Sequence, residues 1–328
     1  PGVKVTYRKN TNYKPRSEPA SYAAGGKVVH FDTVEWLYIP DPATTMNALI
    51  AGEIDFWETP SPDLVPGMEG NPDITIKVID PLGTQGWLRP NHLNPPFDNP
   101  KARQALLHMV KQEHYLQAII GDEKFWRACG AYFMCDTPLD SDVGAGPLMN
   151  QDLEMARKLL KEGGYNGETL ILMDPTDIPV LHGASLVTAQ MLRKIGAKVE
   201  VQAMDWSTLT SRRAETKSIA DGGWNIFHTY STGADVASPI ANIGVSGGCV
   251  EEAWFGWPCD KMLEDLRDQF SRESDPAKQV EIGIALQKRA YEVVPYVNYG
   301  QWFQPTAYRS SLKGVLISPV PFFWNIEK

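Results

Sequence analysis

Hydrophobic and polar residues follow two different periods along the chain, and the period changes repeatedly from one segment to the next. Alternation at every second position predicts a strand, whereas apolar positions three and four apart predict a helix. Strands are expected at 3–7, 34–39, 54–56, 74–79, 169–173, 198–203 and 224–229. Helices are expected at 42–51, 100–120, 153–162, 180–195, 260–270 and 276–292, with further strands and turns from 296 to the end.

Several of the expected helices are bounded by residues suited to helix ends. Asp41, Asn99 and Asp275 each stand directly before a proline, and a side-chain oxygen followed by proline is typical of a helix start. Glycines stand where the apolar stripes end, which is typical of a helix stop; they are Gly52, Gly121, Gly163 and Gly196. Helix and strand alternate through the middle of the chain, which predicts an α/β fold around a mainly parallel sheet.

The bulk composition indicates a soluble globular protein of more than one lobe. A length of 328 residues exceeds what a single core of ordinary size needs, so two lobes are expected. The chain is 43% hydrophobic and 22% charged, and it has no apolar run of 18 residues that could span a bilayer. Its formal net charge of -9 argues against a nucleic-acid partner, because phosphate binding needs clustered cations.

The four cysteines form two close pairs in the sequence, Cys129 with Cys135 and Cys249 with Cys259. An even number of cysteines in local pairs favours two disulfides and an oxidising compartment. A zinc site is the alternative, but zinc ligands usually come as C-x2-4-C pairs, and neither spacing here matches.

Short catalytic signatures are missing from the sequence. It contains no G-x-x-x-x-G-K-[ST], G-x-G-x-x-G, G-x-S-x-G or H-E-x-x-H, so neither a nucleotide cradle nor a hydrolase or zinc-protease motif is indicated. His108 and His114 lie six residues apart on one expected helix, which places them on different faces and argues against a two-histidine metal site. We expect no cofactor and no enzymatic activity.

Six phrases in order along the chain resemble family 5 of the extracellular solute-binding proteins, the peptide- and nickel-binding components of ABC transporters. The first two are YRKNTNY with VEWLYIPDPATTMNALIAGEIDFWE, and GWLRPNHLNPPFDNPKARQALLHMV. The others are DLEMARKLLKEGGYNG, MLRKIGAKVEV, WPCDKMLEDLRDQFSRESDPAKQ and RAYEVVPYVNYGQW. Each phrase alone is of modest specificity, and their shared order carries the resemblance.

The resemblance implies a two-lobed periplasmic-binding-protein architecture of type II. Residues 1–83 would be the remainder of lobe one, 84–299 lobe two, and 300–328 the return to lobe one. Family members carry a long segment before the point where Pro1 falls, so lobe one is expected to be incomplete and the chain to be a truncated or processed form. The hinges would lie near 82–89 and 295–301, and closure of the lobes would bury the ligand.

The main site prediction falls on the loop FHTYSTGADVASP. In peptide-binding relatives the matching loop often reads Trp-x-x-Asp-x-x-Asp-Pro, and its first Asp meets the peptide ammonium. Tyr230 would stand near the aromatic position, Asp235 at the later Asp, and one of 231–233, with Ser231 among them, at the ammonium position. A buried ammonium without a carboxylate is costly, which favours a neutral or anionic solute. If Asp235 reaches the cleft instead, a peptide is favoured.

Further ligand contacts are expected beside the hinges and at the end of the strand before this loop. The candidates are Trp87, Asn91, His228, Thr229 and Trp302, each weighed against plain core packing. The chain has 10 Trp, 12 Tyr and 11 Phe, and such aromatics either fill a core or line a cleft. Trp254 and Trp257, between the second pair of cysteines, are expected to pack on that disulfide.

The sequence therefore predicts an extracytoplasmic substrate-binding protein that captures a small organic solute or short peptide and delivers it to ABC permease subunits. We expect a monomer in the periplasm of a Gram-negative bacterium, in contact with the membrane only through the permease. Three alternatives stay open. They are a nickel or metal-chelate binder with His228 as a ligand, a secreted hydrolase, and an envelope sensor or peptide chaperone on the same fold.

Overall fold

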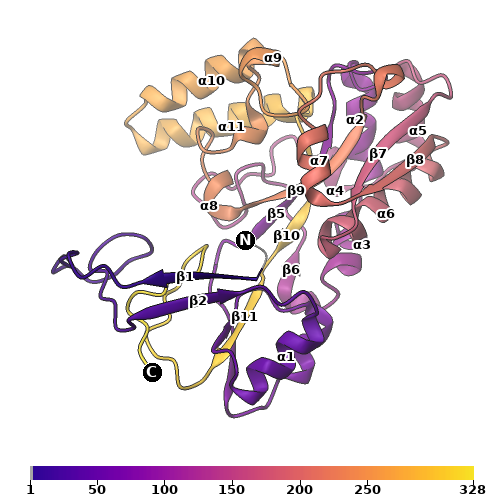
Figure 1. Ribbon diagram of the computed structural model, residues 1–328. Helices are drawn as coiled ribbons and strands as arrows, with labels where there is room; N and C mark the ends of the chain where they lie inside the picture. The colour runs from indigo at the N-terminus through magenta and orange to yellow at the C-terminus, as the bar shows by residue number, and fades with distance from the viewer. Residues whose placement is uncertain (1–2) are drawn as a thin grey trace. The chain divides into compact units, whose positions relative to one another are not determined.

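The computed structural model describes residues 3–328, which separate into two compact units (Figure 1). The chain passes from the smaller unit to the larger one between Gly83 and Thr84, and returns between Trp302 and Phe303. Residues 300–302 belong to the larger unit because they are part of a strand that ends at Trp302. The assignment of these units to the lobes of a larger binding protein stays a prediction.

In the part of the chain that the structure describes, the smaller unit contains two separate sheets and one α-helix. Strands β1 (Lys4–Arg8) and β2 (Thr33–Leu37) form an antiparallel ribbon. A three-stranded sheet has the order β3-β11-β4, with β3 at Phe56–Trp57, β4 at Ile74–Val78 and β11 at Pro305–Arg309. Helix α1 (Pro42–Ala51) and the short helix η1 (Pro62–Gly67) complete the unit.

One core of the smaller unit is built from helix α1 and the strands of the three-stranded sheet. Leu49 of α1 packs with Met68, Ile74 and Ala307. The β1–β2 ribbon is exposed along nearly its whole length although it carries apolar side chains such as Val5. A ribbon of two strands buries little apolar surface, so its stability depends on neighbouring structure.

A six-stranded sheet with the order β6-β10-β5-β9-β7-β8 forms the centre of the larger unit. Its strands are β5 (Thr84–Pro90), β6 (Trp126–Arg127), β7 (Thr169–Pro175), β8 (Lys198–Met204), β9 (Ile226–Thr232) and β10 (Val297–Trp302). Only β9-β7 and β7-β8 are parallel pairings, and the other three are antiparallel. The prediction of a mainly parallel sheet was therefore wrong.

The mixed topology has a physical reason in the connections. Parallel neighbours need a crossover such as the helix between β7 and β8, whereas β5 and β10 are the first and last strands of this unit and run in opposite directions.

The expected hinges at 82–89 and 295–301 fall largely within these two paired strands. The chain passes between the two units at the outer ends of these strands, and the positions of the hinges stay a prediction.

Both faces of the sheet are covered, as strand β7 demonstrates. Leu170 and Leu172 point into the main core with helix α6 (Pro179–Lys194), while Ile171 and Met173 pack in a second core with Leu209 of helix α7 (Trp206–Arg212). Because successive side chains of a strand point to opposite faces, a strand buried on both sides is apolar throughout.

The helix expected over 100–120 is two helices, so that prediction was wrong. Helix α2 (Pro100–Met109) ends at Val110, whose backbone is extended, and α3 (Gln112–Ile119) starts two residues later. The buried amide of Gln112 donates to the carbonyls of Cys129 and Asn298, both at 2.9 Å. These two bonds fix the start of α3 in a direction that a continuous helix could not follow. His108 and His114 therefore lie on different helices.

The remaining expected helices are present with the predicted caps. Asp41, Asn99 and Asp275 each accept a hydrogen bond from a backbone N–H of the first turn. Helix α10 (Lys261–Arg272) lies beside α11 (Pro276–Val293), as Figure 1 shows. The other helices are α4 (Gly146–Met149), α5 (Leu153–Glu162), α8 (Gly233–Val236), α9 (Cys249–Glu252), η2 (Glu123–Phe125), η3 (Ile219–Asp221) and η4 (Ile243–Val245).

Two disulfides are present, Cys129–Cys135 and Cys249–Cys259, as the cysteine spacing predicted. Trp254 and Trp257 of the second disulfide loop pack among other aromatic rings: Trp257 lies against Trp224, and Trp254 against Trp87 and Phe227. Among residues 3–328, no helix combines the length and the apolar composition that crossing a membrane requires.

Candidate ligand-binding site

The end of strand β9 meets the ends of its neighbours in one row across the sheet. Thr232 is paired with Thr84 of β5, and Thr84 is paired with Trp302 of β10. Directly paired residues of antiparallel strands point to the same face, and so do residues two apart along a strand. Tyr230 and Trp302, both predicted as site residues, therefore share one face at this end of the sheet.

Tyr230 and Trp302 begin a series of aromatic contacts that runs into the core. Their ring centroids are 5.8 Å apart at an interplanar angle of 77°. Trp302 stacks on Tyr299 at 6.3 Å, and Tyr299 stacks on Tyr115 at 5.3 Å. Tyr230 is 45% exposed, whereas Trp302 is buried. The series therefore presents one accessible ring that is supported from behind by three buried ones.

The position of Tyr299 depends on a glycine in the neighbouring strand. A Cβ atom at Gly86 would lie 2.1 Å from Cε2 of Tyr299, far inside contact distance. Gly86 is the residue paired with Tyr230 in the β5–β9 ladder. The absence of a side chain there leaves room for the Tyr299 ring beneath Tyr230.

His228 lies on the same face but is fully buried. Its Nε2 is 2.8 Å from Oγ1 of Thr188, and its Nδ1 is 3.2 Å from Oγ of Ser185. Burial lowers the pKa of His228 to about 3, so the ring is neutral near pH 7. With both ring nitrogens bonded to hydroxyls of α6, His228 is not positioned to hold a metal at a surface. Residues 3–328 contain no group of three metal-ligating side chains.

Trp87 and Asn91 are also core residues in the structure. The indole Nε1 of Trp87 donates to Oε1 of Gln85 at 2.9 Å, and its ring stacks on Tyr296 at 4.4 Å. The amide of Asn91 donates to the carbonyl of Trp224 at 3.0 Å and is completely buried. Trp87 points to the face of the sheet opposite Tyr230, and Asn91 follows the end of β5 that is remote from Tyr230. Neither side chain therefore lies beside Tyr230.

Thr229 and Ser231 alternate with Tyr230 and so point to the other face. Thr229 is buried, and its backbone carbonyl accepts a bond of 3.2 Å from the Tyr299 hydroxyl. Ser231 is half-buried and is paired with Gln85. Of the eight predicted ligand contacts, the structure thus leaves Tyr230, Ser231 and Asp235 accessible in the strand and loop.

Asp235 lies in the short helix α8, directly after β9. Its carboxylate is exposed and accepts a bond of 2.8 Å from the Thr232 hydroxyl. In residues 3–328 Asp235 forms no ion pair with a cation. A carboxylate five residues after Tyr230 that is held by one hydroxyl still has acceptor capacity for a cationic group.

The loop after α8 is fastened to the rest of the unit by polar side chains. The amide of Asn242 donates to the Tyr296 hydroxyl at 3.0 Å and is buried. Arg267 donates to the carbonyl of Pro239 at 3.0 Å, and Glu264 accepts from the backbone N–H of Gly247 at 2.6 Å. These anchors were not predicted from the sequence. The signal available there was a polar residue, Asn242, between apolar residues of a loop.

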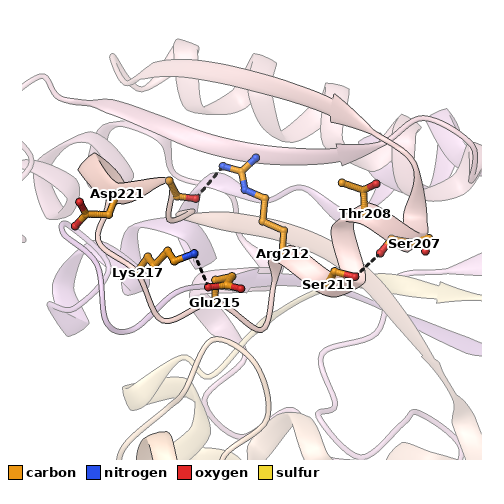
Figure 2. A pocket seen from close by; sticks show the side chains of 8 residues that line it. Ser207, Thr208, Ser211, Arg212, Glu215, Lys217 and Asp221 are labelled. Atoms are coloured by element: carbon orange, nitrogen blue, oxygen red, sulfur yellow. Dashed lines mark hydrogen bonds and ion pairs between the residues drawn. The ribbon is translucent and has the colours of Figure 1, made fainter.

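An open pocket of about 510 Å³ lies elsewhere on the larger unit, between α7 and η3 (Figure 2). Its charged side chains already have partners: Lys217 pairs with Glu215 at 2.8 Å, and Arg212 donates to the carbonyl of Gly222 at 3.2 Å. The pocket contains none of the predicted ligand contacts. Its internally paired charges give a ligand little to bind. The pocket therefore does not compete with the exposed residues at the end of β9, Tyr230 and Asp235, which we call the strand-end surface.

The sequence profile described as the middle region of the bacterial extracellular solute-binding proteins, family 5, matches residues 1–249. The chain belongs to this family. It is 36% identical over its whole length to a probable peptide ABC transporter periplasmic-binding protein, y4tO, of Sinorhizobium fredii, and covers 62% of that protein. It is 25% identical to the oligopeptide-binding protein AppA of Bacillus subtilis, with 91% of the chain and 56% of AppA aligned.

Solved structures of solute-binding proteins share the fold. A dipeptide-binding protein of Pseudoalteromonas sp. SM9913 in complex with Met-Leu matches with a TM-score of 0.80 at 19% identity, covering 100% of this chain and 62% of that one. The periplasmic binding protein AgaA of A. tumefaciens R10, in complex with agropinic acid, matches with a TM-score of 0.80 at 21% identity, covering 99% and 64%. The chain thus spans about three fifths of the length of these proteins.

Proposed function

We propose that this family 5 chain belongs to an extracytoplasmic substrate-binding protein of an ABC importer, and that its ligand is a short peptide. The identity of 36% to a probable peptide-transport binding protein, which extends over the whole chain, is the observation that carries this proposal. Family 5 is a family of solute-binding proteins and not of enzymes. We therefore propose no catalytic role for the strand-end surface.

Asp235 supports a peptide over a neutral or anionic solute. Asp235 stands four residues before Pro239, which is the distance of the first Asp, and not the later one, from the proline of Trp-x-x-Asp-x-x-Asp-Pro. In this register Thr232 takes the Trp position and Ser238 the later Asp. We therefore assign Asp235, and not a residue of 231–233, to the ligand ammonium. An exposed carboxylate without a cation of its own fits that role.

The proposed mechanism divides the predicted residues into two groups. Asp235 binds the ammonium and Tyr230 offers a ring to an apolar part of the ligand, whereas Ser231 points to the other face of the sheet and is assigned no contact. Trp87, Asn91, His228, Thr229 and Trp302 hold the strands and Tyr230 in place from within. Closure of two lobes would then remove water from the ammonium–carboxylate pair and strengthen it.

We propose that the protein works in the periplasm as a monomer and passes its ligand to permease subunits in the membrane. The two disulfides support an oxidising compartment, because such bonds are rare where thiols are kept reduced. We therefore also propose a Gram-negative host. The net charge of -9 argues against a nucleic-acid partner.

Native mass spectrometry of the full-length protein, purified gently from its own periplasm, tests this proposal. A retained mass that fragments as a peptide is the expected result. A retained organic acid or sugar derivative would replace the peptide by another solute, and a retained nickel chelate would favour metal uptake. Hydrolysis of added peptides by the purified protein would contradict the proposal that it is a carrier.

A further inference from the structure

Arg89 of strand β5 is a fully buried cation whose partners are all backbone carbonyls. Its guanidinium donates to Gly244 and Phe255, both at 2.6 Å, to Pro295 at 2.9 Å and to Trp254 at 3.1 Å. No carboxylate is among these acceptors. A buried charge is tolerated only when nearly all its donors are bonded, so the four carbonyls have to stay in place around it.

The four carbonyls come from three different segments of the chain. Gly244 lies in the loop 233–248 that carries Asp235, Trp254 and Phe255 lie in the disulfide loop 249–259, and Pro295 precedes strand β10. Arg89 itself is in β5, and β5 and β10 are the two strands that continue into the smaller unit. One side chain thus joins the ligand loop to both connecting strands.

The disulfide loop is shaped around Arg89. The ring of Trp254 contacts two guanidiniums, with its centroid 5.4 Å from Cζ of Arg89 and 5.0 Å from Cζ of Arg213. A Cβ atom at Gly256 would lie 2.7 Å from Nε of Arg89, so the loop backbone approaches the side chain as closely as glycine permits. The bond between Cys249 and Cys259 closes this loop behind Gly256.

Gly244 connects Arg89 to the rest of the loop 233–248. Its backbone N–H donates to the side chain of Asn242 at 3.0 Å, and Asn242 in turn donates to the Tyr296 hydroxyl at 3.0 Å. Tyr296 directly follows Pro295, another acceptor of Arg89. The loop is therefore fixed twice to the start of β10, once through Arg89 and once through Asn242.

We infer that Arg89 is a positioning residue that holds the loop 233–248, and with it Asp235, in its ligand-binding conformation. The inference rests on the proposed function in that the loop is taken to bind the ligand, but the ordering of the loop can be measured without any ligand. Loss of Arg89 releases the loop 233–248 and the disulfide loop together, because the carbonyls of both loops lose their donor, the Arg89 guanidinium.

Arg103 provides a matched control inside the same unit. It is also buried and donates only to backbone carbonyls, those of Val293 at 2.8 Å, Phe97 at 2.7 Å and Asp98 at 3.1 Å. None of these three belongs to loop 233–248 or to the disulfide loop. Arg89→Met and Arg103→Met therefore remove the same chemistry, and only the first removes it from the ligand loop.

Hydrogen exchange of the full chain without ligand tests the inference. The urea concentration is adjusted for each variant so that the two variants are compared at the same global stability. We expect amide exchange within 239–259 to be at least tenfold faster in Arg89→Met than in Arg103→Met, and unchanged in β7 and β8. Arg89→Lys, which keeps the charge and three donors, is expected to restore part of the protection. Should Arg89→Met not fold, Arg89→Lys against Arg103→Lys gives the same comparison.

Equal exchange in the two variants, or a change spread evenly over the unit, would overturn the role of Arg89. Calorimetry with a tripeptide then separates the two claims. If the wild type binds the peptide, Arg89→Met is expected to bind at least tenfold more weakly and Arg103→Met as the wild type does. If the wild type binds no peptide while the exchange result holds, the proposed function fails and the role of Arg89 in ordering the loop stands.

Discussion

Nε2 of His228 lies 2.8 Å from Oγ1 of Thr188, within the buried interface between strand β9 and helix α6. Thr188 also bonds the hydroxyl of Tyr115 at 2.8 Å, so the imidazole ends a short buried chain of polar groups. The ring of Tyr299 lies 5.7 Å away. None of these neighbours carries a charge near pH 7, which explains why burial alone dominates the titration of His228.

Acid is expected to destabilise the protein through His228. The folded pKa of about 3 lies below the ordinary value of 6.5, so the unfolded chain binds a proton that the folded state excludes. The stabilisation is complete above pH 6.5 and is lost progressively as the pH falls towards 3. One such proton corresponds to about 1.4 kcal/mol per pH unit within this window. Urea unfolding at pH 7, 6 and 5 measures it.

His228→Gln isolates this effect because glutamine donates and accepts hydrogen bonds but does not titrate. We expect the variant to be less stable than the wild type at pH 7 and to lose less stability between pH 6 and pH 5. Parallel stability curves for the two proteins would contradict the assignment of a neutral, buried His228.

Gly86→Ala is expected to destabilise the larger unit by about 2–3 kcal/mol, because the new methyl group displaces the buried ring of Tyr299. Gly146→Ala is the control, since a Cβ there meets nothing within 4 Å. Urea midpoints compare the two variants. Equal stability of both would mean that Tyr299 does not occupy the space above Gly86.

The two disulfides are expected to contribute independently to stability. Replacing Cys129 and Cys135 by serine, or Cys249 and Cys259 by serine, should each lower the free energy of unfolding by about 2–3 kcal/mol, as loop closure entropy predicts for short loops. Thiol titration of the unreduced, unfolded protein should find no free thiol. Finding four would refute both bonds.

Tyr230→Ala should weaken ligand binding about tenfold while the melting temperature stays nearly unchanged. The ring is 45% exposed and touches Trp302 at its edge, so its loss leaves no cavity in the core. Tyr13→Ala removes a ring that is 42% exposed in the smaller unit and serves as control. Unchanged calorimetric affinity in Tyr230→Ala would remove this residue from the site.

Local signals in the sequence predicted much of the fold. Asp41, Asn99 and Asp275 cap helices as expected, since the side chain, the proline and the first turn are neighbours in the chain. The break at Val110 was missed because its cause is distant: Gln112 bonds the carbonyl of Asn298, which the sequence places 186 residues away. Strand direction was missed for the same reason.

The candidate site was predictable only in part. The loop after β9 was found through its resemblance to a family phrase, but alternation along the strand could not tell which side chains stay accessible. Tyr230 is exposed while His228, two residues earlier on the same face, is covered by α6. Arg89 gave no signal because an arginine in a sequence is normally read as a surface residue.

Calorimetric titration of the full-length protein with a tripeptide, in free and N-acetylated form, tests the central proposal most directly. We predict that the wild type binds the free peptide and that acetylation weakens binding at least a hundredfold, because Asp235 then lacks an ammonium partner. Asp235→Asn should weaken binding of the free peptide by a similar factor. Equal affinity for both peptides, or full affinity in Asp235→Asn, would contradict an ammonium site at Asp235 and favour a neutral or anionic ligand.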